Sequence, residues 1–385
     1  NLSILYAKAD NIGGISSKIP EPELTIDFSN NSDITLNDDA SIDNGSLVLT
    51  GKADSYAVYN GDISTLGLID SITISIDASA VVPFGSYNYM LFTLGSNTDQ
   101  LYIRASRNTL AAGIIHGNLK SEVTGPGLSN NVFKNIVMTH TYDPEAKGTL
   151  SIFVNGLLGN RISGIDIPLG SIVNVPDCTV LLGKSLQNGI NGYNGKLDNL
   201  KIWNTGSEGN KVLTARQIAA LNGLDLEAAM EEIMDKDLAY LKTDTDTTSK
   251  ALYYDQRIHD PVVHDVLLWQ TGKISGNRIT WTSSNENLLS IFKDANGNDY
   301  SAKLVTPPER DTKVTLTATI HIPDPDGGEF TKSKDLEVTV LSLESRRQAD
   351  YDALEITNMN DVRDNLPFIV AGKYGSRISW TSSNP

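Results

Sequence analysis

The chain has 385 residues, of which 39% are hydrophobic and 20% are charged, and its length favours two or three globular domains. Its formal charge of −16 comes from 47 acidic and 31 basic residues. This charge excludes nucleic acid, anionic membrane surfaces and strongly anionic polysaccharides as expected partners, and leaves neutral glycans and cations. The apolar runs are shorter than the ~20 residues of a membrane-spanning helix, so no membrane span is expected. The one cysteine, Cys178, can form neither an internal disulfide nor a cysteine-based zinc site.

Residues 1–23 are expected to form a linker or the remnant of an upstream module. The run Pro20-Glu21-Pro22 favours an extended backbone, because proline fixes its own φ and restricts the residue before it. The first residue is Asn1 rather than an initiator methionine, so we expect a mature or internal piece of a longer protein.

Residues 24–223 alternate short apolar runs with clusters of Asn, Gly, Ser and Asp, a pattern typical of antiparallel strands joined by tight turns. The dipeptide Asn155-Gly156 is the strongest hairpin signal, because these residues accept the positive φ angles of a two-residue turn. The pattern predicts an all-β sandwich or jelly roll. A helix at 213–221, with Thr214 as its N-cap, is expected to close it.

Residues 224–250 predict a connecting helix followed by a loop, since apolar residues recur at helical spacing from Leu226 to Leu238. The last third contains an internal repeat, in which the segment 276–285 returns as 375–384. Each copy holds a tryptophan, Trp281 or Trp380, that we expect in a core. We therefore predict an immunoglobulin-like β-sandwich over 251–343 and a truncated second copy over 344–385.

The first module resembles the laminin-G-like, concanavalin A-like jelly rolls of bacterial surface enzymes. The residues that carry the resemblance are Val137-Met138-Thr139, Tyr142-Asp143, the run 148–156, Leu181-Leu182-Gly183-Lys184-Ser185 and the run 193–204. Phe133 departs from the family pattern, which usually has an indole there. The last third resembles reduced, or atrophied, bacterial immunoglobulin-like domains through the runs 279–285, 305–307, 314–319 and 336–340. Together the two resemblances imply a secreted, modular glycoside hydrolase as the parent protein.

The sequence contains no recognised catalytic motif. The glycosidase string Glu-x-Asp-x-x-Glu, which would put three carboxylates on one face of a strand, does not occur. The five histidines lack metal-ligand spacing, and no nucleophile elbow or phosphate-binding loop is present. A catalytic pair of acids that are distant in the sequence stays open as an alternative.

The resemblance to jelly rolls implies a structural Ca²⁺ ion. By position in the family its ligands are Asp27 and Asp198, with Asn30 and Asp54 as weaker candidates. Oxygen ligands from separate loops suit Ca²⁺. The alternative is that these acids sit at turns and strand ends and accept backbone hydrogen bonds.

Sugar binding requires exposed aromatic faces beside amide and carboxylate groups. The loop 84–89 fits best, and with residues on the neighbouring strands it gives four expected ligand contacts: Tyr87, Tyr89, Tyr102 and Arg104. Core packing is the alternative for each tyrosine.

We therefore predict a non-catalytic, carbohydrate-binding accessory region of a secreted or cell-surface protein. The jelly roll would bind a neutral polysaccharide or oligosaccharide, and the immunoglobulin-like domains would act as spacers to neighbouring domains of the same polypeptide. One alternative is a surface adhesin or structural stalk. A lower-ranked one is a catalytic β-sandwich glycosidase.

Overall fold

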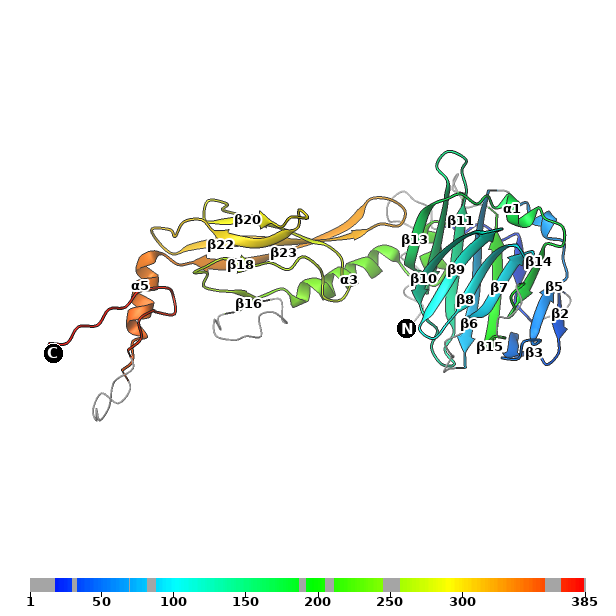
Figure 1. Cartoon of the computed structure of the whole chain (residues 1–385), viewed down its shortest axis with the longest axis horizontal. Helices are drawn as coiled ribbons and strands as arrows, with labels where there is room; N and C mark the ends of the chain where they lie inside the picture. Colours follow the sequence, from blue (N-terminus) through cyan, green and yellow to red (C-terminus); the bar gives the residue numbers. More distant parts are fainter. Residues whose placement is uncertain are drawn as a thin grey trace. The chain divides into compact units, whose positions relative to one another are not determined.

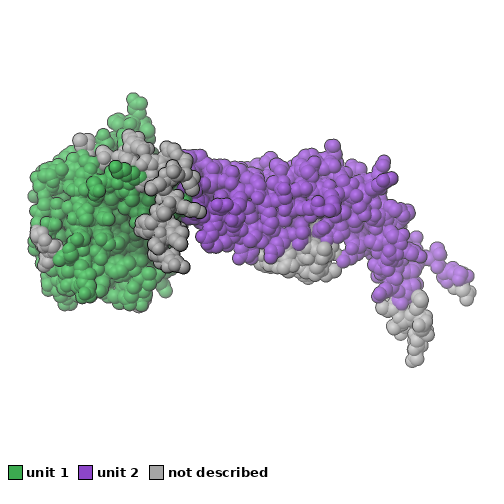
Figure 2. Space-filling model, turned by 180° about the vertical axis from the view of Figure 1, so that it is seen from behind, with its two compact units in different colours: residues 1–226 green, residues 227–385 purple. Residues whose placement is uncertain are grey.

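The computed structural model describes residues 18–29, 33–68, 70–81, 88–186, 192–204, 211–244, 257–356 and 368–383. The chain divides into two compact units, residues 1–226 and 227–385, and each is described by itself (Figure 2). Both are built mainly of antiparallel strands, which confirms the all-β prediction. None of the helices in the described ranges is long and apolar enough to cross a membrane.

The first unit consists of two sheets that face each other across a core (Figure 1). Sheet A has the order β13 (Leu157–Ile165), β12 (Gly148–Val154), β11 (Lys134–Thr141), β6 (Ser71–Ala80), β15 (Asn194–Trp203), β4 (Ser46–Thr50) and β3 (Ser41–Asp43), with β1 (Leu24–Ile26) paired to β15. Sheet B has the order β10 (Leu119–Pro126), β9 (Thr109–His116), β8 (Asp99–Ala105), β7 (Tyr89–Gly95), β14 (Thr179–Leu182), β5 (Tyr56–Tyr59) and β2 (Ile34–Asn37). A short 3₁₀ helix, η2 (Ile63–Leu66), and a single turn of helix, α1 (Gly170–Val173), complete the connections.

The hairpin predicted at Asn155-Gly156 joins β12 to β13. Asn155 and Gly156 have φ values of 50° and 83°, so both occupy the left-handed region that a two-residue turn of this kind requires.

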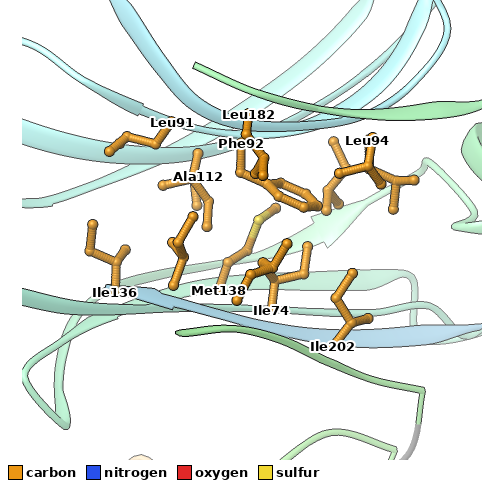
Figure 3. Packing of buried hydrophobic residues seen from close by; sticks show 14 of the residues in the cluster. Ile74, Leu91, Phe92, Leu94, Ala112, Ile136, Met138, Leu182 and Ile202 are labelled. Carbon is orange, nitrogen blue, oxygen red and sulfur yellow. The ribbon is translucent and has the colours of Figure 1, made fainter. Parts of the chain in front are cut away.

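The core lies between the sheets because alternate residues of each strand point inward. Ile74, Ile136, Met138 and Ile202 of sheet A meet a set of sheet B side chains (Figure 3). The sheet B members drawn in that view are Leu91, Phe92, Leu94, Ala112 and Leu182. All of them are fully buried, so truncating one of the larger members to alanine would cost about 2–5 kcal/mol. The residues between them along each strand face outward and form the two outer surfaces of the sandwich.

Helix α2 (Ala215–Leu221) lies on the outer face of sheet A. Its first turn is fixed by a capping box, in which the Thr214 side chain accepts from Gln217 N and the Gln217 side chain accepts from Thr214 N. Leu213 N, just before the helix, donates to Thr73 Oγ1 on β6 over 3.1 Å. At the other end, Asn222 Nδ2 donates to Asn135 Oδ1 on β11 over 2.9 Å. The helix therefore carries Asn222 to a defined position on the sheet.

The described part of the second unit contains two three-stranded sheets and two longer helices. One sheet contains β19 (Ile279–Ser283), β22 (Thr312–Pro323) and β23 (Glu329–Val340), and the other contains β18 (Val266–Leu267), β21 (Asp299–Leu304) and β20 (Leu289–Lys293). A parallel pair, β16 (Lys242–Asp244) and β17 (Arg257–His259), and helix α5 (Leu343–Asp352) also belong to it.

Helix α3 (Leu226–Tyr240) is the helix predicted as a connection, and it packs within the second unit. Lys332 on β23 forms ion pairs with Glu231 and Asp235, and Lys334 donates to two backbone carbonyls at the end of the helix. The domain boundaries predicted inside the two units stay predictions.

The internal repeat extends back from the tryptophan segments to the two helices. Asp237 of α3 accepts from Ile274 N and Ser275 Oγ, and a Cβ atom at Gly272 would lie only 2.4 Å from its Oδ2. Asp350 of α5 likewise accepts backbone hydrogen bonds from the turn beyond Gly372, where a Cβ atom would lie 2.1 Å from its Cγ. Each copy therefore begins with a helix whose buried aspartate holds a glycine turn.

The two repeat tryptophans differ in burial. Trp281 is 3% exposed and donates to Trp269 O. Trp380 makes the same kind of bond to Ile369 O, but it is only partly buried and stacks on Phe368. The expectation of a core position therefore holds for Trp281 and is wrong for Trp380.

Candidate functional site

The outer face of sheet B holds two of the predicted ligand contacts, Tyr102 and Arg104. Both belong to β8 and alternate with the core residues Leu101 and Ile103. Tyr102 lies flat on β9, where a Cβ atom at Gly113 would be 2.2 Å from its Cζ. The side chain is 1% exposed, and its hydroxyl donates to Glu122 Oε2 over 2.6 Å. The ring therefore has no open face on which a sugar could stack.

Arg104 and Glu122 form the centre of this outer face. Arg104 Nε and Nη2 both donate to the Glu122 carboxylate, and Nη1 donates to Asn88 Oδ1 over 2.7 Å. Burial raises the pKa of Glu122, but the hydrogen bonds from Arg104 and Tyr102 outweigh it and hold that pKa below its usual range. Burial, with smaller contributions from the hydrogen bond to Glu122 and from its charge, raises the pKa of the Tyr102 hydroxyl. The result is a charge-paired network in which the polar groups satisfy one another.

Of the two remaining predicted contacts, the structure describes Tyr89. Tyr89, at the start of β7, is partly buried and packs against the hydrophobic core. Tyr87 lies outside the described residues. The structure therefore brings Tyr102 and Arg104 together, but not as an open binding surface.

The predicted calcium ligands Asp27 and Asp198 come from neighbouring strands, since Ile26 lies opposite Leu200. Asp27 Oδ1 accepts from the backbone and hydroxyl of Ser29, which lowers the Asp27 pKa. Asp198 accepts from Ser46 Oγ over 2.9 Å and from Asn199 N over 2.8 Å.

Asn30, the third predicted ligand, lies outside the described residues, and Asp54 pairs with Lys184. Across the described ranges, no group of three or more His, Cys, Asp or Glu side chains is placed to hold a metal ion. These residues alone do not fit a complete calcium site.

A polar cavity of about 380 Å³ opens on the outer face of sheet A. We call it the asparagine cleft. It is lined by Ser75, Asp77, Phe133, Asn135, Asn155, Asn199, Lys201, Leu221 and Asn222. These residues come from three strands, the loop before β11, one hairpin and the end of helix α2, so the cleft exists only in the folded unit.

Asp77 is the acceptor around which the cleft is ordered. Its Oδ1 accepts from Asn135 Nδ2 over 2.8 Å and its Oδ2 accepts from Asn199 Nδ2 over 2.9 Å. Asn135 is fixed further by Ser75 Oγ, at 2.9 Å from the same Nδ2, and by Asn222. A carboxylate can accept about four hydrogen bonds, so two acceptor positions on Asp77 remain after the amides are counted.

The other amides keep hydrogen-bonding groups for a ligand. Asn155 Oδ1 accepts from Asn135 N over 3.0 Å, while its Nδ2 has no partner among the residues that the structure describes. Over the same residues, the Oδ1 atoms of Asn199 and Asn222 have none either. The cleft therefore offers donors and acceptors together, which is what a hydroxyl group needs because it both donates and accepts.

Phe133 forms the apolar edge of the cleft. Its side chain is 43% exposed. The preceding loop is held over β6 by the bond from Asn131 N to Ala80 O at 2.8 Å. An exposed aromatic face beside fixed amides and a carboxylate is an arrangement suited to a sugar ring.

The residues of the asparagine cleft were not among the predicted contacts. In the sequence, Phe133 stands out only as a departure from the family pattern, and Asn155 only as a turn residue. The available signal is their combination: an aromatic residue before the first, and an Asn-Gly turn after the second, of two predicted antiparallel strands, positions that meet at one end of the pair.

Comparisons with known proteins give no family. No family model matches the chain, and no curated protein matches it. Among solved structures, the carbohydrate-binding module CBM40 of a Ruminococcus gnavus IT-sialidase, bound to α2,3 sialyllactose, has 15% identity and a TM-score of 0.36. The match covers 46% of this chain and 96% of that one.

The receptor-binding domain of botulinum neurotoxin C/D mosaic serotype has 13% identity and a TM-score of 0.42, with 79% of this chain and 74% of that one covered. Likenesses at this level carry no argument about function. The resemblances to laminin-G-like and immunoglobulin-like families also stay predictions.

Proposed function

We propose that the first unit is a non-catalytic module that binds a neutral glycan in the asparagine cleft. The observation that carries the proposal is the exposed Phe133 ring beside hydrogen-bonding groups that are already held in place around Asp77. Because neighbouring side chains fix these groups before binding, little side-chain entropy is lost when a ligand arrives.

Charge supports a neutral rather than an acidic sugar. The cleft contains one carboxylate, Asp77, and one cation, Lys201, among its lining residues. The chain as a whole carries a formal charge of −16. A carboxylated or sulfated glycan would approach against that field without a paired basic cluster to receive it.

Binding is favoured over hydrolysis by the hydrogen bonds of the acids. Asp77 and Asp198 lie opposite each other on β6 and β15. Glycoside hydrolysis needs two carboxyl groups that act on the bond between sugars. Here Asp77 accepts from the amides of Asn135 and Asn199, and Asp198 accepts from Ser46 Oγ, so both serve as hydrogen-bond acceptors within the folded unit.

The wider context belongs to the same proposal. The first unit would target a secreted or cell-surface glycoside hydrolase to its substrate, and the second unit would act as a spacer. A structural Ca²⁺ ion near Asp27 and Asp198 is the cofactor that the family resemblance implies. A surface adhesin that uses the same cleft is the alternative.

The test is a screen of neutral plant and host oligosaccharides on a glycan array, followed by calorimetry on the hits. Phe133→Ala should weaken binding at least tenfold, because it removes the exposed ring. Phe292→Ala is the matched control, since Phe292 is also exposed, at 46%, but lies in the second unit. Absence of binding to every neutral glycan, or equal loss in the two variants, would refute the proposal. Release of reducing sugar by the chain would contradict its non-catalytic part.

A further inference from the structure

A second cavity of about 380 Å³ lies on the outer face of sheet A. It is lined by Val48, Leu49, Ser79, Val81, Asn131, Phe133, Asn194, Gly195 and Lys196. Its character differs from that of the asparagine cleft, because Val48 and Val81 belong to its lining and no carboxylate occurs among the described residues that line it. Val81 is 46% exposed there, on a surface that would otherwise favour polar residues.

The two cavities follow one another along the same strands. Ser75 and Asp77 line the first and Ser79 lines the second, and these are successive outward positions on β6. On β15 the register is the same, with Lys201 opposite Ser75 and Lys196 opposite Ser79. From Ser75 to Ser79 the strand rises about 14 Å, at ~3.4 Å per residue. The path is therefore longer than one sugar ring.

Phe133 is the residue that the two cavities share. Its ring stands at the boundary between a polar half, ordered by Asp77, and an apolar half that contains Val81. A sugar ring has polar edges, where its hydroxyls lie, and apolar faces formed by its C–H groups. The first half suits the edges of one unit, and the second half suits a face of the next.

We propose that the two cavities form one groove with two subsites, which binds a chain of at least two neutral sugar units across Phe133. The inference rests on the proposed function, because it assumes that the asparagine cleft binds sugar. The polar subsite fixes the orientation of the first unit through Asp77 and the amides. The apolar subsite adds affinity for the second unit through Val81 and the Phe133 ring. Chain length then becomes part of the specificity.

Calorimetry on the full chain with length series of xylo-, cello- and manno-oligosaccharides tests the groove. In the series that binds, the Kd should fall at least tenfold from the monosaccharide to the disaccharide. Val81→Glu, which places a carboxylate in the apolar subsite, should abolish that gain and leave monosaccharide binding within twofold. Val132→Glu is the matched control, because Val132 is 55% exposed and lines neither cavity.

Three outcomes would overturn the groove. Equal affinity for the monosaccharide and its oligomers would reduce the site to one subsite while leaving the proposed function standing. If Val81→Glu weakens binding equally for all lengths, the second subsite is likewise excluded and the proposed function still stands. Absence of binding at every length in all three series, with the glycan array also negative, would refute the proposed function and the groove with it.

Discussion

Each outer face of the first unit holds a carboxylate at the centre of a polar cluster, Glu122 on sheet B and Asp77 on sheet A, and the partners of these two carboxylates differ. On sheet B, Glu122 faces the guanidinium of Arg104, with Tyr102 as a further donor. On sheet A, the hydrogen-bond partners of Asp77 within the described part of the chain are the neutral amides of Asn135 and Asn199. The first arrangement is closed, because a charged pair satisfies its own atoms. The second is open, because amides leave part of the carboxylate and part of themselves unused.

This difference separates stability from binding. The Arg104–Glu122 pair is largely removed from water, with side-chain exposures of 13% and 19%, and breaking it should cost folding energy. The Asp77 cluster is partly exposed, and its unused hydrogen bonds go to water until a ligand displaces that water. Each face can therefore be disrupted by itself and assayed for both properties.

The largest expected effect is that of Glu122→Gln on stability. The change leaves the Arg104 guanidinium partly buried without a counter-charge, so the free energy of unfolding should fall by about 3 kcal/mol. Urea denaturation of the first unit measures it. Affinity for the neutral glycan should stay within twofold. A large loss of affinity would instead support the sugar contacts that the sequence predicts at Tyr102 and Arg104.

The pH dependence of stability tests the buried layer between the two sheets independently of both outer faces. His140 points into the sandwich, and burial lowers its pKa from 6.5 to about 4, against a weaker opposing effect of the hydrogen bond with Ile167 O. The unfolded chain therefore binds the proton at higher pH than the folded chain does. The stability that depends on neutral, buried His140 is fully present above about pH 6.5 and is lost as the pH falls from there towards 4. The loss amounts to roughly 3 kcal/mol, at about 1.36 kcal/mol per pH unit.

Denaturation midpoints at pH 7.0 and 4.5 measure this loss, and His140→Gln should flatten the dependence. An NMR titration gives a second readout that does not need the variant to fold. If the His140 imidazole titrates near pH 6.5 in the folded protein, the assignment is contradicted.

Local features of the fold could be predicted from the sequence, and the features that create the cleft could not. Asn155-Gly156 and Thr214 act within a few residues, so their turn and cap follow from the residues themselves. The register that sets Asp77 opposite Asp198, and the docking of α2 that brings Asn222 to Asn135, join segments more than 80 residues apart. No local pattern in one sequence predicts such long-range contacts.

Two backbone details also could not be predicted from the sequence. The irregularity in β15 between Asp198 and Lys201 leaves Asn199, with φ of 48°, exposed and facing Asp77. On the other face, Gly113 lies beside Tyr102 only because β8 and β9 pair in that register. The sequence does not reveal this register, so it predicts a sugar contact at Tyr102, whereas the ring lies flat against the neighbouring strand.

Removal of calcium tests sheet A with a smaller expected effect on stability. If Ca²⁺ binds near Asp27 and Asp198, EDTA should lower the melting temperature, by up to the equivalent of about 2.7 kcal/mol when the ion is present at 100 times its Kd. Asp198→Ala should remove the EDTA effect. Asp43→Ala is the matched control, since Asp43 is a sheet A acid that pairs with Lys196. An unchanged melt on adding EDTA would exclude the ion.

Asp77→Asn gives the smallest expected change in energy and the sharpest contrast with Glu122→Gln. It removes an acceptor that the glycan hydroxyls would use, so the Kd should rise about tenfold, equivalent to about 1.4 kcal/mol. Stability should change by less than about 1 kcal/mol, because the substitution also removes the like-charge opposition between Asp77 and Asp198 on neighbouring strands.

Calorimetry and urea denaturation on the same two variants complete the test. The expected pattern is reciprocal, with affinity lost in Asp77→Asn and stability lost in Glu122→Gln. If Asp77→Asn destabilises the unit as much as Glu122→Gln does, the amide cluster is a structural network like that of sheet B. In that case the difference in partner chemistry between the two faces does not separate binding from folding.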